Sequence, residues 1–134
     1  MSAQDILKMI EEVDPNDTAK LDEIDARVWC FLNNRAFHGM TDKGQFYYNL
    51  HYPLSMAHPK EGIIEYARSR DTLKAIRPEG WHYFIDSRGG CKLWSVDCTR
   101  PEFHAQNNNC GMLRTEELAE LHAIIQAIDF ERTK

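Results

Sequence analysis

A carboxylate flanked by two imidazoles is the arrangement in this chain most suited to binding or acid–base chemistry. His82, Asp97 and His104 are predicted to lie side by side on three neighbouring strands, where paired positions are about 5 Å apart. Such a row can fix imidazole tautomers, ligate a metal, act as a general base with its orienting group, or hold a phosphate. It can equally be a hydrogen-bonded polar row without a ligand. Because no nucleophile with an elbow signature accompanies it, we predict ligand or partner binding and no catalytic residues.

Three cysteines near His104 match the ligand types of a Cys₃His zinc site. They are Cys91, Cys98 and Cys110. Seven residues of strand would separate Cys91 from Cys98 by more than about 20 Å, and the chain has no Cys-x-x-Cys pair. Separate buried or cross-strand thiols are therefore the favoured interpretation, and Cys30 is most simply a core residue. We expect no metal and no other cofactor.

An antiparallel meander over residues 81–110 has to position these groups. Segments 81–86 and 92–97 are rich in aromatic and β-branched residues and flank Gly89-Gly90, a two-residue hairpin signal,. Strand alternation then predicts two faces. The apolar face, expected to pack on the last helix, carries Trp81, Tyr83, Ile85, Trp94, Val96, Cys98, Phe103 and Ala105. The polar face, expected to bind, carries His82, Phe84, Asp86, Arg88, Leu93, Ser95, Asp97, His104 and Gln106.

The predicted register follows from the two turns. A two-residue turn at Gly89-Gly90 places Ile85 opposite Trp94 and His82 opposite Asp97. A second turn over residues 99–102 brings the next strand back beside the second. His104 then lies opposite Asp97, which completes the row.

Acidic residues are concentrated at the start of the chain. Residues 1–25 hold eight carboxylates against two lysines, which gives −6, whereas the whole chain carries −5. Asp22, Glu23 and Asp25 are the candidate contacts of an acidic helical face that could dock on a basic groove, such as the channel of a nucleic-acid-binding protein. A solvated helix surface is the alternative interpretation.

A basic cluster lies further along the chain. Arg70, Lys74 and Arg77 follow helical spacing, with Arg68 just before them. They could touch an anionic ligand. Asp71 beside them and the negative net charge of the chain argue against broad nucleic-acid binding. A solvent-exposed helix face without a ligand is the favoured interpretation.

Helices are predicted at both ends of the chain and before the meander. Their expected N-caps are Ser2, Asp17 or Thr18, Ser69 and Thr115,. The first helix should end before Asp14-Pro15, the second at Asn33-Asn34, and the third should cover 70–77. The last has the clearest apolar stripe, made of Leu118, Leu121, Ile124, Ile125 and Ile128,.

Between residues 36 and 66 the pattern degrades. Glycine and proline interrupt it, and only 45–52 reads as a strand,. This segment is either an irregular insertion or a recognition loop. Tyr47 and Tyr48 are its candidate binding residues.

Length and composition indicate one domain over 1–134, divided into an acidic helical part (1–35), the irregular segment (36–66) and an α-βββ-α part (67–134). No apolar run approaches the roughly 20 residues of a membrane span. The N-terminus lacks a secretory signal pattern,. We therefore expect a cytoplasmic protein with reduced cysteines.

Two short motifs add a resemblance. Tyr66-Ala67-Arg68-Ser69-Arg70-Asp71 precedes the third predicted helix, and Pro78-Glu79-Gly80-Trp81 follows it. Together with the meander and the closing helix, they resemble small phage and prophage proteins of the "phage ABA sandwich" type over about residues 66–130. The resemblance implies an antiparallel sheet covered by helices and a phage or prophage origin. It implies no catalytic residues, because that family has no agreed activity.

The expected fold class is α+β: an antiparallel meander of three or more strands packed against helices, two of them N-terminal and one long and C-terminal. The expected function is that of a phage-derived, non-enzymatic binding protein that occupies and inhibits a host protein or nucleoprotein complex, as an anti-CRISPR-like inhibitor of host defence would. A nucleotide-sequestering protein and a small metal-dependent hydrolase are the alternatives. A homodimer is left open, and no membrane partner is expected.

Overall fold

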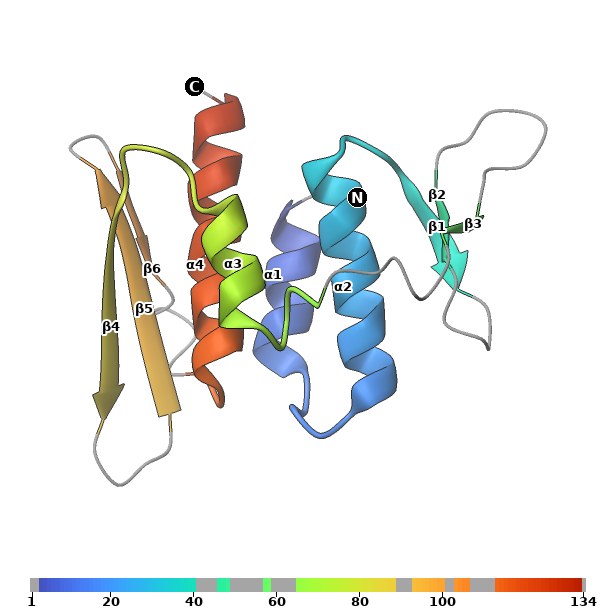
Figure 1. Cartoon of the computed structure of the whole chain (residues 1–134), viewed down its shortest axis with the longest axis horizontal. Helices are drawn as coiled ribbons and strands as arrows, with labels where there is room; N and C mark the ends of the chain where they lie inside the picture. Colours follow the sequence, from blue (N-terminus) through green and yellow to red (C-terminus); the bar gives the residue numbers. More distant parts are fainter. Residues whose placement is uncertain are drawn as a thin grey trace.

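The computed structural model describes the backbone of residues 3–40, 46–48, 57–58, 65–88, 93–100, 103–106 and 113–133. Side chains are described at 3–40, 46, 65–69, 71–81 and 113–133. The helices in these ranges are α1 (Ala3–Glu12), α2 (Thr18–Leu32), α3 (Arg70–Ile76) and α4 (Glu116–Thr133). Figure 1 shows them side by side in the middle of the molecule, with strands on either side.

Three helices begin where local capping chemistry predicts. Asp17, Ser69 and Thr115 each accept a hydrogen bond from the backbone N–H three residues further on, at 3.2, 3.3 and 3.1 Å. Each bond satisfies one of the N–H groups that a helix start leaves without a helical partner. The predicted caps are confirmed, with Asp17 rather than Thr18 starting α2. Ser2 lies outside the described residues.

The predicted end of α2 is also confirmed. Asn33 is its C-cap, and Asn34 adopts the left-handed conformation with φ of 55°. Asparagine tolerates that conformation better than most residues do, because its short polar side chain can hydrogen-bond locally. The end of α2 can therefore be predicted from the local sequence.

Helix α4 is central to the described core. Its predicted stripe is buried at Leu118, Leu121, Ile124 and Ile125, but the other side of the helix is buried as well. The reason is that α1 and α3 contact it on one side while β5 and β6 lie along the other (Figure 1). Two ionisable residues of α4, Glu120 and His122, are consequently buried.

Trp81 anchors the segment that follows α3. Its side chain is buried, and its ring lies 5.9 Å from the ring of Phe130 in an edge-to-face arrangement. The indole Nε1 donates a hydrogen bond to Glu131 Oε1 at 2.9 Å, so the polar end of the side chain is satisfied. The prediction that Trp81 packs on the closing helix is confirmed. Its predicted companions on the apolar face have side chains outside the described set.

A small sheet follows α2, within a segment for which the sequence predicted only one strand. It pairs β1 (Phe37–Met40) with β2 (Phe46–Tyr48) and β2 with β3 (Ala57–His58), both antiparallel. Phe46 is fully buried against Ala26 and Cys30 of α2. Because Phe46 lies 5.6 Å from Trp29, ring centre to ring centre, this contact attaches the small sheet to the helices.

The second set of strands has a register that differs from the prediction. It consists of β4 (His82–Arg88), β5 (Leu93–Arg100) and β6 (Phe103–Gln106). Arg88 pairs with Leu93, so the first connection is two residues longer than a Gly89-Gly90 turn, and Arg100 pairs with Phe103, so the second is shorter than expected. Each pairing is therefore shifted by two residues, and the predicted register is wrong.

The predicted fold class is corrected as well. Among residues with described side chains, helices account for 64 %, and the strands contribute only the short β1 and Phe46 of β2. The described buried cluster is built from the four helices, with Tyr66, Ala67, Trp81 and Leu113 added from their flanking segments. In this part of the chain, the protein is mostly helical rather than organised around an antiparallel meander. The described core forms among the helices because α4 packs against α1 and α3, and these long-range helix contacts do not show in strand or helix propensity.

Within the described ranges, none of the helices combines the length and the apolar character that crossing a bilayer requires.

Candidate functional site

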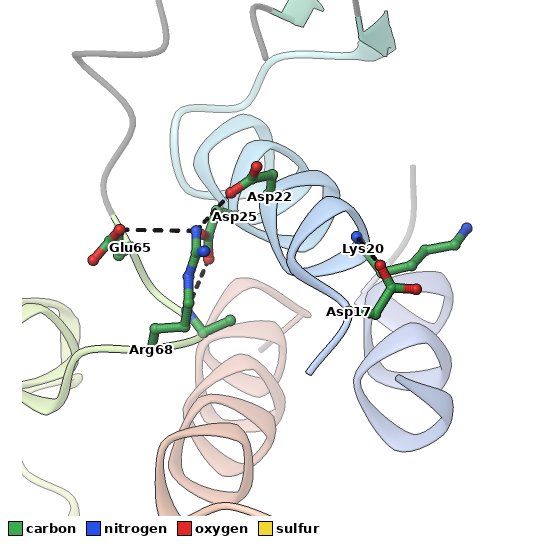
Figure 2. Close-up of polar contacts among 7 residues, drawn as sticks. Asp17, Lys20, Asp22, Asp25, Glu65 and Arg68 are labelled. Carbon is green, nitrogen blue, oxygen red and sulfur yellow. Dashed lines mark hydrogen bonds and ion pairs between the residues drawn. The ribbon is translucent and has the colours of Figure 1, made fainter. Parts of the chain in front are cut away.

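A buried carboxylate organises the contact between α2 and the segment that leads into α3 (Figure 2). Asp25 is 0 % exposed. Its Oδ1 accepts a hydrogen bond from the backbone N–H of Ala67 at 2.8 Å, and its Oδ2 accepts one from Arg68 Nη2 at 2.8 Å. The same Nη2 donates to Asp22 Oδ1 at 2.7 Å and lies 3.9 Å from Glu65 Oε1.

Helical spacing turns Asp25 inward. It lies four residues after Leu21 and three before Val28, so it shares their buried side of α2,. Burial raises the pKa of Asp25 to about 6, although the bonds from Ala67 and Arg68 act in the opposite direction. A carboxylate with both oxygens bonded and no exposed surface cannot reach a substrate. This cluster therefore has a structural role.

A second buried carboxylate holds the C-terminal end of α3 against α4. Arg77, the C-cap of α3, donates through Nη2 to Glu120 Oε1 in the second turn of α4, and Glu120 is 0 % exposed. Arg68 and Arg77 thus stand just before and just after α3 and connect it to two different helices. Helix α3 is fastened at both ends by an arginine that meets a buried acid.

The third buried ionisable side chain joins α4 to α1. His122 Nε2 lies 2.9 Å from Glu11 Oε2. Burial lowers the pKa of His122, and the contact with Glu11 only partly opposes that effect. Among the described side chains, Asp25, Glu120 and His122 are the buried acidic or basic ones, and each is bonded to a partner from another element. None of them offers a free acid or base.

These contacts change the interpretation of both predicted charged surfaces. Of the acidic candidates, Asp25 is buried and Asp22 is bonded to Arg68, while Glu23 pairs with Arg27 at 2.9 Å. Of the basic candidates, Arg68 and Arg77 are committed to buried acids. Arg68 joins the two predicted surfaces, whereas Glu23 and Arg77 have partners outside them. One signal was available in the sequence: a carboxylate at an inward position of an apolar stripe.

An acidic hollow remains open to solvent at the turn between α1 and α2. It has a volume of about 310 Å³ and is lined by Met9, Glu12, Val13, Asp14, Asp17, Lys20 and Ile24. The three carboxylates are on exposed residues, whereas Met9 and Val13 are half-buried. Asp14 Oδ1 accepts from the N–H of Asn16 at 2.9 Å, and Asp17 Oδ1 accepts from that of Lys20 at 3.2 Å. Sequence reasoning noted the acidity here but not the hollow.

The predicted polar row has its backbone in β4, β5 and β6. Asp97 pairs with Phe84 and Gln106, whereas His82 and His104 both pair with Thr99. The three residues are therefore not direct cross-strand neighbours, as the predicted register required. Their binding role stays a prediction, because their side chains lie outside the described set.

The other predicted binding residues of the strands are described by their backbone alone. Asp86 and Arg88 belong to β4, and Tyr47 and Tyr48 belong to β2. Their side chains, like that of Phe84, are not among those described.

Of the four cysteines, Cys30 has a described side chain. Cys30 is buried, and burial raises the pKa of its thiol to about 11, which confirms the prediction of a core cysteine. Among the described residues, no group of three or more His, Cys, Asp or Glu side chains is arranged to hold a metal ion. The backbone of Cys98 lies in β5, and Cys91 and Cys110 lie outside the described residues.

Comparison with protein-family models, with curated proteins and with solved structures found no match for the chain.

Proposed function

We propose that this protein is a non-enzymatic binding protein that occupies a host macromolecule and blocks it, using the acidic surface around the turn between α1 and α2. The expected setting is a phage or prophage and the cytoplasm of its bacterial host. That origin rests on the resemblance of residues 66–130 to phage ABA-sandwich proteins. The expected target is a protein or nucleoprotein complex of the host defence.

One observation carries the proposal. Asp25, Glu120 and His122 of the described core are each bonded to a charged side chain from another element, so they serve the fold. Glu12, Asp14 and Asp17, in contrast, keep their carboxylates at an exposed hollow. Although Asp14 and Asp17 each also accept one backbone hydrogen bond, carboxylates exposed at a hollow are within reach of a partner. Complementary surface charge speeds encounter and selects partners more than it adds affinity.

The test compares two charge reversals of equal size. Glu12 lies at the hollow and Glu79 lies after α3, and both are exposed. Tagged wild type, Glu12→Lys and Glu79→Lys would be used to capture host proteins, and the partner identified by mass spectrometry would be purified for binding measurements. We expect Glu12→Lys to weaken binding by about tenfold and Glu79→Lys to leave it unchanged.

Ionic strength supplies a second readout. If the acidic surface carries the contact, the difference between wild type and Glu12→Lys should shrink as salt screens the charges. A purified partner that binds Glu12→Lys as tightly as wild type would contradict the proposed surface. Absence of any partner at micromolar concentration, together with a nucleotide that raises the melting temperature, would favour the nucleotide-binding alternative.

A further inference from the structure

The hollow between α1 and α2 combines two kinds of surface. Met9 and Val13 are half-buried and supply an apolar wall, and Ile24 lies beneath them in the core. Glu12, Asp14 and Asp17 stand around the opening. A ligand that fits both surfaces needs an apolar part and a positive end.

The carboxylates at the opening are held in place. Asp14 and Asp17 each use one oxygen for a backbone N–H of the same turn, so their second oxygens are positioned without help from a ligand. Lys20 is the one basic residue in the lining; its side chain is 59 % exposed, and its Nζ lies 3.9 Å from Glu23 Oε1. The lining therefore carries an excess of negative charge that Lys20 only partly offsets.

We propose that this hollow receives one arginine or lysine side chain of the protein partner. The inference rests on the proposed function and names the chemistry of its contact. The aliphatic stem of the incoming side chain lies against Met9 and Val13, and its cationic head meets Glu12, Asp14 and Asp17. Long basic side chains bury their stems and keep their heads polar in this way.

The geometry disfavours other occupants. A nucleic-acid backbone would bring phosphates next to three carboxylates, which repel them. The described residues hold no group arranged as metal ligands. A volume of about 310 Å³ is at the lower end of the range for small-molecule pockets, which suits a single side chain.

The test uses two peptides that differ only in charge. The first is a capped alanine pentapeptide with a central arginine, and the second has citrulline, its neutral isostere, at the same place. Binding is followed by NMR through the methyl groups of Met9 and Val13. We expect the arginine peptide to shift these signals and to bind at least about tenfold more tightly than the citrulline peptide. Equal binding of the two peptides, or shifts that miss both methyl groups, would overturn the inference.

Matched variants separate a local contact from a general charge effect. Glu12→Gln should weaken binding of the arginine peptide, while Glu79→Gln, which removes the same charge elsewhere, should not. Equal weakening by both variants would overturn the inference. The two proposals can fail separately. A partner whose binding is weakened by Glu12→Lys but not by Met9→Gln would support the proposed acidic surface and overturn the insertion of a basic side chain into the hollow.

Discussion

The acidic residues of α2 and of the turn before it form two regions, one bonded within the fold and one exposed to solvent. Asp22 and Asp25 meet Arg68 on the inner side of α2, and Asp25 has no contact with solvent. In the turn just before the same helix, Asp14 and Asp17 border an open hollow. Both regions contain aspartates, but one pair bonds to Arg68 and holds two elements together, whereas the other pair faces solvent.

Position on the helix and the presence of a distant cation decide between the two outcomes. Asp25 follows the apolar positions of α2 into the core, where an isolated charge would be very costly without a partner. Arg68 and the N–H of Ala67 supply that partner. Net charge in a segment therefore says little about a surface until long-range pairs are known.

The largest effect that separates the two regions is expected from Asp25→Ala. It removes a buried acceptor from both Arg68 and the Ala67 N–H, and we expect a loss of about 3 kcal/mol in the free energy of unfolding. Urea denaturation measures it. A loss below about 1 kcal/mol, the range of an exposed pair, would show that Asp25 is not the tie that the contacts indicate.

The pH dependence of stability should differ in sign between two buried groups. The pKa of Asp25 is raised from 3.8 to about 6, so its stabilising contribution is fully present below pH 3.8 and is lost as pH rises through about 6. The pKa of His122 is lowered from 6.5, so its contribution is present above pH 6.5 and is lost as the solution is acidified.

Urea unfolding across this pH range checks both signs. The stability of wild type relative to Asp25→Asn should fall as pH rises, and that of wild type relative to His122→Gln should rise. Parallel curves in either comparison would contradict the assigned shift.

A smaller effect is expected from Asp22→Ala. Asp22 also bonds to Arg68, but its side chain is 22 % exposed, and water can replace part of the lost interaction. We expect a loss of at most about 1 kcal/mol in the free energy of unfolding. A loss equal to that of Asp25→Ala would mean that the two aspartates act as one buried unit, which a double-mutant cycle would reveal.

The smallest effect on stability is expected from Glu12→Gln. Its carboxylate is exposed at the hollow, and surface substitutions of this kind usually stay within about 0.5 kcal/mol. Thermal and urea unfolding should match wild type. A clear destabilisation would show that the Glu12 side chain stabilises the fold, and Glu12 would no longer be a candidate contact for a partner.

Features that depend on neighbours in sequence could be predicted. The caps at Asp17, Ser69 and Thr115 and the stop at Asn33-Asn34 are local, because each involves groups within a few residues. The inward positions of the α4 stripe follow from helical spacing. What surrounds the helix does not, so the burial of Glu120 and His122 was missed.

Features that depend on distant residues could not be predicted. Arg68 and Asp25 are separated by 43 positions, as are Arg77 and Glu120, and no local pattern links them. The meander register failed for a related reason: it relied on two assumed turn lengths, and a change of two residues in each moves every pairing along the strands,. The His82 and Asp97 pairing depended entirely on that register.

The two arginine ties of α3 also impose an order on assembly during synthesis. Domains emerge from the ribosome N-terminus first, so the tie between Asp25 and Arg68 can close as soon as α3 has emerged. The tie from Arg77 has to wait for Glu120, and the contact between Glu11 and His122 spans 111 positions. Until α4 arrives, the apolar sides of α1 and α3 lack their main partner. We therefore expect the nascent chain to be most vulnerable to proteases just before its last helix is completed.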